Sequence, residues 1–209
     1  MNHNNWLNDP CEKMMTERIK DYLANNNAAR IIAQQLDETG TSIRPIVDHV
    51  TVRTLNVEES AKEFLKLGFV YDSKLGVLEY EDWWAKVYRK NGYPSVFIDQ
   101  PFEGKRGEKN VIHEWVGAFG SKTFHHIAIQ VGEIEVAVAQ FKKLGIELAG
   151  EIAGEKESDL RQVFTKPDMK NGKPFTVLEI AERHRGYEGF LPPQANKLME
   201  STRLKKSPY

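Results

Sequence analysis

The sequence of 209 residues contains one cysteine, Cys11, and this scarcity excludes two kinds of site. A single cysteine cannot form an intramolecular disulfide, and it cannot supply a cluster of thiolate ligands to a metal. Any metal site in this chain must therefore be built from histidine and carboxylate side chains. The first residues also lack the apolar segment of a signal peptide, so we expect a cytoplasmic protein.

An excess of positive charge and a long apolar run are missing as well. The chain has 29 lysines and arginines against 30 aspartates and glutamates, which gives a net charge of −1. This balance offers nothing to attract nucleic acid or an anionic membrane surface. No apolar run approaches the ~20 residues of a membrane span. We expect no nucleic-acid or membrane partner, and 40% hydrophobic residues suffice for one domain or for two small fused modules.

The first part of the chain has the pattern of two helices. Apolar residues recur at helical spacing after Glu12, and three asparagines at residues 25–27 interrupt them. Asparagine is a favoured N-cap, so this run predicts the start of a second helix, which ends at Gly40. We expect this helical extension, residues 1–45, to pack on the rest of the protein.

The remainder of the chain contains a repeat. Residues 49–69 align without gaps with residues 126–146, and this alignment sets His49 against His126. Each copy starts with the alternating pattern of a strand and continues with the pattern of an amphipathic helix. Both helical patterns end in a Leu-Gly pair, and glycine is a common helix terminator. The repeat predicts two similar modules.

Each copy ends on an apolar strand that carries a carboxylate. Residues 94–99 align with 174–179 at a slightly larger offset than that of the first strands, which pairs Asp99 with Glu179. Two more strand-like segments precede this strand in each copy, and in the second copy they are residues 147–152 and 161–166, before a turn at 167–174. The order of elements in each module is therefore β-α-β-β-β.

These patterns divide the chain into five parts. We expect modules over residues 46–102 and 123–184, with a linker at 103–122 between them. Residues 185–209 are expected to form a helix that starts near residues 192–193 and has an apolar side of Leu198, Met199 and Leu204. Such a helix can pack as a lid over the mouth of a cleft.

The repeat pairs His49 with His126. If the two modules are related by a pseudo-twofold axis, equivalent positions face one shared cleft, where His49, His126 and Glu179 converge and Asp99 takes the fourth equivalent position. Neighbouring residues of a strand point to opposite faces, so His125 is predicted to point away, toward the helix-packed side or the rim. Two imidazoles and one carboxylate with open positions are the ligand set of a non-haem Fe(II) site.

Strand periodicity places further side chains beside this predicted site. Arg53 shares the face of His49 and is predicted to reach the cleft, where a guanidinium suits a carboxylate. An exposed strand end or a structural ion pair is the alternative for Arg53. Gln162 and Phe164 share one face of the strand next to that of Glu179, and ordinary core packing is the alternative for Phe164.

Paired β-α-β-β-β modules with histidine on the first strand and glutamate on the last resemble the vicinal oxygen chelate superfamily. This superfamily includes glyoxalase I, extradiol dioxygenases, methylmalonyl-CoA epimerase and 4-hydroxyphenylpyruvate dioxygenase. Residues 160–183 are similar to the end of 4-hydroxyphenylpyruvate dioxygenase. Residues 21–40 with 46–56, and then 93–101, are similar to the 2-oxoadipate dioxygenase/decarboxylase family. The chain has two modules, whereas 4-hydroxyphenylpyruvate dioxygenase has four.

The resemblance implies an α+β protein of two paired β-α-β-β-β modules, the vicinal oxygen chelate fold, with an N-terminal helical extension. It implies a metal-binding Glu179, substrate contacts from Gln162 and Phe164, and a carboxylate anchor at Arg53. The favoured function is an Fe(II)-dependent dioxygenase that decarboxylates a small 2-oxo acid with dioxygen as co-substrate. The oligomeric state stays open.

Two other functions remain open from the sequence. One is a redox-silent isomerase, epimerase or lyase of the glyoxalase type that uses Zn, Ni, Co or Mn. In the glyoxalases the position of Asp99 supplies a fourth metal ligand, whereas in the dioxygenases it does not. The other is a non-catalytic member that keeps the cleft and binds a ligand there.

Overall fold

The computed structural model describes residues 9–202 of the chain. The helices are α1 (Pro10–Ala24), α2 (Asn27–Glu38), α3 (Val57–Lys66), α4 (Val111–Phe119), α5 (Ile134–Lys143) and α6 (Pro192–Ser201), with short 3-10 turns at Arg44–Ile46 and Gly104–Arg106. The strands are β1 (Val47–Arg53), β2 (Val70–Tyr71), β3 (Leu78–Glu79), β4 (Trp83–Arg89), β5 (Ser95–Pro101), β6 (Phe124–Val131), β7 (Leu160–Phe164), β8 (Asp168–Lys170) and β9 (Lys173–Arg183). None of the helices in residues 9–202 is long and apolar enough to cross a membrane.

Within residues 9–202, nine strands form one sheet in the order β2-β4-β5-β1-β6-β9-β7, with β3 on β4 and β8 on β9. The two first strands of the modules, β1 and β6, are antiparallel neighbours. Outward from β1 the order is β5, β4 and β2, and outward from β6 it is β9 and β7. Only isolated bridges at Leu148 and Ala153 stand beside β7, so the strand predicted at residues 147–152 is wrong. Both halves otherwise repeat one strand order, which confirms the α+β architecture of two paired modules.

The pairing of β1 with β6 shows how the two modules are related. His49 pairs with Ala128, and Thr51 pairs with His126. This reciprocal pattern is the one that a twofold axis between the strands requires, with His49 equivalent to His126 and Thr51 equivalent to Ala128. The alignment of the repeat read from the sequence is therefore confirmed for the first strands.

The last strands follow a different register from the predicted one. In the parallel pair of β6 and β9, Ala128 lies opposite Glu179. In the parallel pair of β1 and β5, the equivalent residue Thr51 lies opposite Phe97. Phe97 is therefore the equivalent of Glu179, and the predicted equivalence of Asp99 and Glu179 is wrong by two positions.

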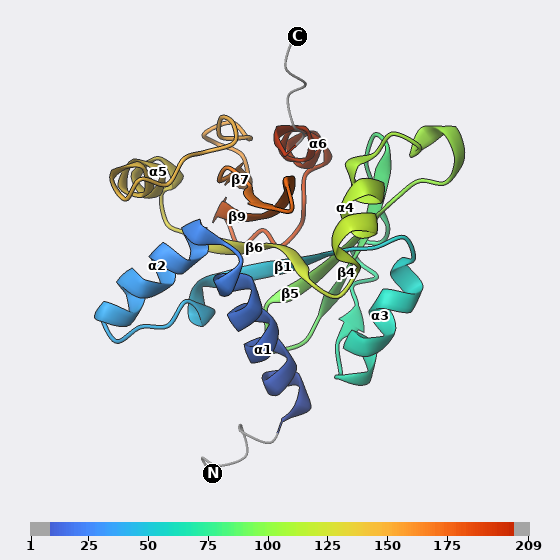
Figure 1. Cartoon of the computed structure of the whole chain (residues 1–209), viewed down its shortest axis with the longest axis horizontal. Coiled ribbons are helices and arrows are strands. Elements are labelled where there is room, and N and C mark those ends of the chain that lie inside the picture. The colour runs from blue at the N-terminus through green and yellow to red at the C-terminus, as the bar shows by residue number, and fades with distance from the viewer. Residues whose placement is uncertain (1–8, 203–209) are drawn as a thin grey trace.

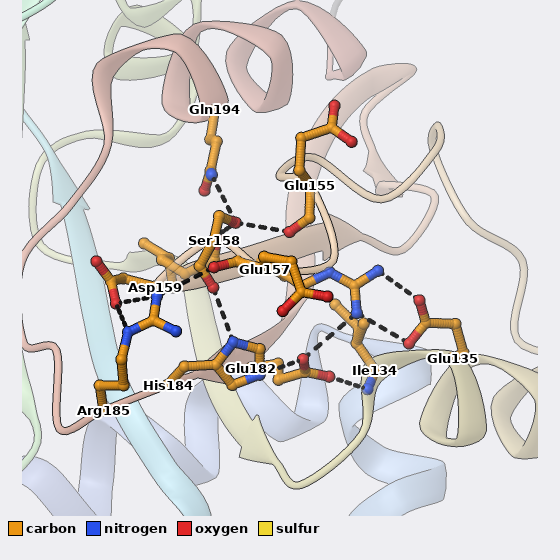
Figure 2. A network of polar contacts seen from close by, with 12 residues as sticks. Ile134, Glu135, Glu155, Glu157, Ser158, Asp159, Glu182, His184, Arg185 and Gln194 are labelled. Atoms are coloured by element: carbon orange, nitrogen blue, oxygen red, sulfur yellow. Dashed lines mark hydrogen bonds and ion pairs between the residues drawn. The ribbon is translucent and has the colours of Figure 1, made fainter.

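The starts of the two crossover helices support the corrected register. The backbone N–H of Val57 at the start of α3 donates to Gln100 Oε1 on β5, over 2.7 Å. The backbone N–H of Ile134 at the start of α5 donates to Glu182 Oε2 on β9 (Figure 2). The repeat aligns Val57 with Ile134, and the corrected register aligns Gln100 with Glu182. In both modules the last strand thus satisfies an orphan donor at a helix N-terminus.

Two register shifts between β1 and β6 mark β-bulges. Val47 pairs with Ile129 and His49 with Ala128, so Asp48 is the extra residue of β1. The second shift, between Thr51 and Val52, makes His125 the extra residue of β6. Asp48 and His125 directly precede the equivalent histidines His49 and His126, so the two bulges occupy equivalent places in the two modules.

Helices α1, α2, α3 and α5 cover one face of the sheet. Figure 1 shows α1 and α2 across β1 and β6, on the side opposite α6. Asn26 caps α2, as the asparagine run predicts, and its side chain also donates to Thr176 of β9. The hydroxyl of the buried Tyr22 donates to the carbonyl of Val177. The predicted packing of the helical extension on the main body is confirmed.

The other face of the sheet carries α4 and α6. Helix α4 lies in the segment that was expected to be a linker, and its N-cap is Asn110, whose side chain accepts from the N–H of Ile112. Helix α6 buries Leu198 and Met199, as its apolar side predicts, while Leu204 lies outside the described residues. The domain boundaries themselves stay a prediction. This second face holds the polar cluster described next.

Candidate metal centre

The three predicted ligand residues meet on the face of the sheet that α6 covers. His49 lies on β1, His126 on β6 and Glu179 on β9, and all three side chains are buried. One potential ligand atom from each lies within 4.8 Å of the others. The Nε2 atoms of His49 and His126 are 3.4 and 3.2 Å from Glu179 Oε2. Ligand atoms that bind one ion at ~2.1 Å lie roughly 3 Å apart, so these residues fit a divalent metal.

Burial and the neighbouring charges shift the pKa values of all three residues of the cluster. Burial opposes ionisation of Glu179, but His49 and His126 lower its pKa to about 2. Burial also opposes protonation of His49, but Glu179 and then Asp48 raise its pKa to about 9. Burial lowers the pKa of His126 to about 4, against the attraction of Glu179. The group therefore presents an ionised carboxylate and a neutral imidazole, with a second imidazole that a metal can free of its proton.

Three further side chains of β1 and β7 contact the cluster. The side-chain amide of Gln162 donates to Glu179 Oε1, which leaves Oε2 directed at the histidines. The Thr51 hydroxyl is 2.7 Å from His126 Nε2 and would have to turn from that nitrogen when a metal binds. The ring of Phe164 packs 5.0 Å from the ring of His126. Gln162 and Phe164 thus lie against the cluster, at the place that strand periodicity predicts.

The fourth symmetry-equivalent position carries no ligand atom. Phe97 occupies it, with its ring 6.4 Å from the ring of His49 and 4.9 Å from that of Phe190. Asp99, the predicted fourth equivalent, is not part of the metal-binding group. The cluster therefore offers three protein ligands, and an aromatic ring stands where a four-ligand site would have a carboxylate.

Arg53 lines the cleft, as predicted, and it also forms an ion pair, with Asp99, which was the alternative for this residue. Arg53 Nε is 3.7 Å from Asp99 Oδ2, and both residues are buried. Burial lowers the pKa of Arg53 to about 10 and raises that of Asp99 to about 7, each against the attraction of its partner. Among the described residues, Arg53 Nε and Asp99 Oδ1 have no hydrogen-bond partner. Since Arg53 also donates to the sulfur of Met199, a weak acceptor, its guanidinium keeps unused donor capacity.

The space above the cluster is small and mostly aromatic. A cavity of about 40 Å³ is lined by the three ligand residues and by Arg53. Its walls also include Tyr80, Trp83, Phe97, Phe164, Phe190, Leu198 and Met199. Arg53 also lines a second, larger cavity of about 420 Å³, so the two cavities are neighbours. His125, Trp115 and Phe175 form part of the wall of this larger cavity.

Comparison by sequence finds no matching family model and no matching curated protein. Comparison by structure finds hydroxyglutarate synthase from Oryza sativa in complex with 2-oxoadipate, with a TM-score of 0.68 and 17% identity over 91% of each chain. A glyoxalase superfamily protein from Ralstonia eutropha JMP134 has a TM-score of 0.65 and 12% identity, over 85% of this chain and 84% of that one. A 4-hydroxymandelate synthase variant from Streptomyces coelicolor has a TM-score of 0.60 and 18% identity, over 77% of this chain and 55% of that one.

These likenesses, together with the paired modules, decide the fold. The chain has the vicinal oxygen chelate fold. At sequence identities of 12–18% these likenesses establish the fold alone and do not establish the chemistry of this chain. In this fold the cleft between the paired modules is where His49, His126 and Glu179 converge.

One prediction about this vicinal oxygen chelate cleft is wrong in direction. His125 was predicted to point to the helix-packed side or the rim. It does not lie on the face that α1, α2, α3 and α5 cover, because it is the bulged residue of β6 and the bulge interrupts strand alternation. Its ring lies against Trp115 and Phe164, and its Nδ1 is 2.9 Å from Nδ1 of His126. His125 is nonetheless outside the metal-binding group, as expected.

Sequence reasoning missed most of the aromatic wall. Trp83 is not among the predicted site residues, although its position on alternate residues of β4 is compatible with the cleft face. Phe97 was missed because the predicted register of the last strand placed Asp99, and not Phe97, at the position equivalent to Glu179. Tyr80 and Phe190 lie outside the regular strands and helices, so no periodic pattern marks them.

Proposed function

We propose that this chain is an Fe(II)-dependent dioxygenase that oxidatively decarboxylates a small 2-oxo acid. The observation that carries the proposal is the three-ligand set of His49, His126 and Glu179 with Phe97 at the fourth equivalent position. Two histidines and one carboxylate with open positions are typical of non-haem Fe(II) oxygenases. A Lewis-acid enzyme of the glyoxalase type would instead use a fourth protein ligand, which Phe97 cannot supply.

When bound, Fe(II) would supply coordination of the 2-oxo acid and activation of dioxygen. The substrate loses one carbon as CO₂ and takes up both atoms of O₂, so the reaction needs no external reductant. The protein's part is to hold the ion, orient the acid and exclude water. Gln162 keeps Glu179 in place through its hydrogen bond. The rings of Trp83, Phe164 and Phe190 line the site and make its walls apolar.

Arg53 supports a substrate with a second carboxylate. The Nε of its buried guanidinium lies near Asp99 but has no hydrogen-bond partner, and a terminal nitrogen donates to a thioether, so a carboxylate would improve its hydrogen bonding. The structural relative in complex with 2-oxoadipate, a dicarboxylic 2-oxo acid, supports the same choice. We therefore propose a dicarboxylic 2-oxo acid as substrate, with its far carboxylate on Arg53.

The cavity above the cluster must enlarge before such a substrate can bind. A volume of about 40 Å³ holds about three water molecules at ~10–15 Å³ each, whereas ligand sites commonly measure roughly 300–1,000 Å³. Leu198 and Met199 of α6 line this small cavity, and Arg53 lines both it and the cavity of about 420 Å³. Movement of α6, or of the Arg53 side chain, is therefore part of the proposal.

Oxygen uptake tests the proposal directly. The purified chain would be loaded with Fe(II) without oxygen and then mixed in an oxygen-electrode cell with 2-oxoadipate, 2-oxoglutarate, pyruvate or phenylpyruvate. We expect one CO₂ released per O₂ consumed, without added reductant, and no uptake by His126→Ala. Conversion of a substrate with Zn, Ni, Co or Mn and no oxygen consumption would favour an isomerase or lyase. Ligand binding without turnover would favour a non-catalytic protein.

A further inference from the structure

The two β-bulges place one extra residue directly before each histidine of the metal cluster. Asp48 is the bulged residue before His49, and His125 is the bulged residue before His126. A bulge re-aims a side chain that regular alternation would send to the opposite face. Both bulges therefore bring a polar side chain back toward the histidine that follows it.

Each bulged residue contacts the same atom of its neighbour. Asp48 Oδ2 lies 2.7 Å from Nδ1 of His49, and His125 Nδ1 lies 2.9 Å from Nδ1 of His126. In each case the Nε2 atom is the one that faces Glu179. A histidine whose Nδ1 donates a hydrogen bond keeps its lone pair on Nε2, which is the form that binds a metal through that atom.

The two contacts differ in chemistry. Asp48 is an ionised carboxylate that Arg183 holds through two hydrogen bonds, of 2.7 Å from Nε and 2.8 Å from the terminal nitrogen. His125 is a buried imidazole between the rings of Trp115 and Phe164. To accept from Nδ1 of His126, His125 must be neutral and carry its own proton on Nε2. One ligand histidine thus donates to an anion and the other to a neutral ring.

We propose that Asp48 and His125 are positioning residues for the metal, and that they make its two histidine ligands unequal. Asp48 makes His49 the stronger electron donor, because a hydrogen bond to a carboxylate raises the basicity of the ring. His125 selects the tautomer of His126 without adding charge. This inference rests on the proposed metal centre, but it does not depend on the reaction or on the identity of the substrate.

Co(II) alone, added to the purified full-length protein without substrate, is the probe for this inference. Its d–d absorption reports the ligand field, and competition with a chelator gives its affinity. We expect Asp48→Asn to weaken Co(II) binding about 10- to 100-fold and to shift the d–d bands. His125→Leu is expected to weaken binding less, whereas His125→Asn, which keeps an acceptor oxygen, recovers most of the affinity.

A matched variant separates positioning from structural support. Arg183→Met removes the ion pair on Asp48 but leaves the carboxylate against His49, so it is expected to retain the wild-type d–d spectrum. If Asp48→Asn and Arg183→Met change Co(II) affinity and spectrum equally, Asp48 acts only through stability. If Asp48→Asn and His125→Leu both keep wild-type affinity and bands, the positioning roles are refuted.

The same Co(II) titration also tests whether the metal centre exists, separately from the roles of Asp48 and His125. A wild-type protein that binds no Co(II), or a His126→Ala variant that binds it normally, refutes the metal centre. Co(II) binding that depends on Asp48 and His125, in a protein that consumes no oxygen with Fe(II), refutes the proposed dioxygenase and supports the positioning roles. Equal losses in Asp48→Asn and His125→Leu refute the inequality of the two ligands.

Discussion

Replacing Arg53 by lysine is expected to raise KM for a dicarboxylic 2-oxo acid and to leave the metal content unchanged. Arg53 lines the cavity beside the cluster, and a guanidinium has hydrogen-bond donors but no acceptor, so it is not expected to bind the metal. Lysine keeps the positive charge beside Asp99 but has no planar pair of donors, so it cannot bind a carboxylate in the bidentate manner of arginine.

The magnitude follows from the hydrogen bonds that Arg53 has available. Its Nε has no hydrogen-bond partner and a terminal nitrogen donates only to Met199, so two donors are available for a substrate carboxylate. A hydrogen bond to a charged group contributes about 1.5–3 kcal/mol. Loss of one of two such bonds raises KM about 10- to 150-fold, at about 1.4 kcal/mol for each factor of ten. A substrate with no second carboxylate loses neither bond.

Steady-state oxygen uptake with the Fe(II)-loaded protein measures the effect. KM would be compared for 2-oxoadipate and 2-oxoglutarate against 2-oxobutyrate and phenylpyruvate, with iron content and melting temperature determined for each variant. Arg18→Lys is the matched control, because Arg18 pairs with Glu63 at 2.7 Å and is remote from the cleft lining. An equal rise in KM for all four acids, or no rise for the dicarboxylic acids, would refute the anchor role of Arg53.

Four further predictions concern the metal and the scaffold. His126→Ala is expected to lose the single equivalent of bound metal in elemental analysis, because two ligands remain. Burial opposes protonation of His49, but Glu179 raises its pKa to about 9, so a metal must displace a proton from the His49 ring. Co(II) affinity should therefore rise about tenfold per pH unit from pH 7 toward pH 9 and then level off, whereas a flat profile would contradict this. Phe97→Asp places a carboxylate at the fourth equivalent position and is expected to tighten Zn(II) binding while slowing oxygen uptake. Gln100→Ala removes the acceptor at the start of α3 and is expected to lower the free energy of unfolding by about 1–2 kcal/mol in urea, with metal content unchanged.

Local patterns in the sequence were sufficient for most of the elements. The asparagine run at residues 25–27 predicted an N-cap, which the structure places at Asn26. The Leu-Gly pairs predicted the helix ends at Gly68 and Gly145, where the structure has φ of 88° and 78°. Positive φ is easily adopted only by glycine, so this signal is a property of single residues. Helix α4 was missed because it lies in a segment without a repeat partner.

The convergence of His49, His126 and Glu179 could be predicted from two signals. The gap-free alignment from His49 pairs it with His126, and the resemblance to the vicinal oxygen chelate superfamily implies a metal-binding Glu179. The equivalent of Glu179 could not be predicted. The connection between the helix and the last strand is longer in the second module than in the first. No local sequence pattern shows how this difference changes the register of the last strand. Only the pairing of β5 with β1 identifies Phe97.

The sequence by itself determined the helical extension and the repeated module, because caps, periodicity and repeat spacing are properties of short segments. It also identified His49, His126 and Glu179 as candidate ligands. The tertiary structure alone decided which face His125 takes and what closes the cleft. Strand alternation assumes one residue for each step of the ladder, and the hydrogen bonds between β1 and β6 decide where an extra residue enters. The contact of Arg53 with Met199 joins residues 146 positions apart, so it depends on how α6 packs on the sheet.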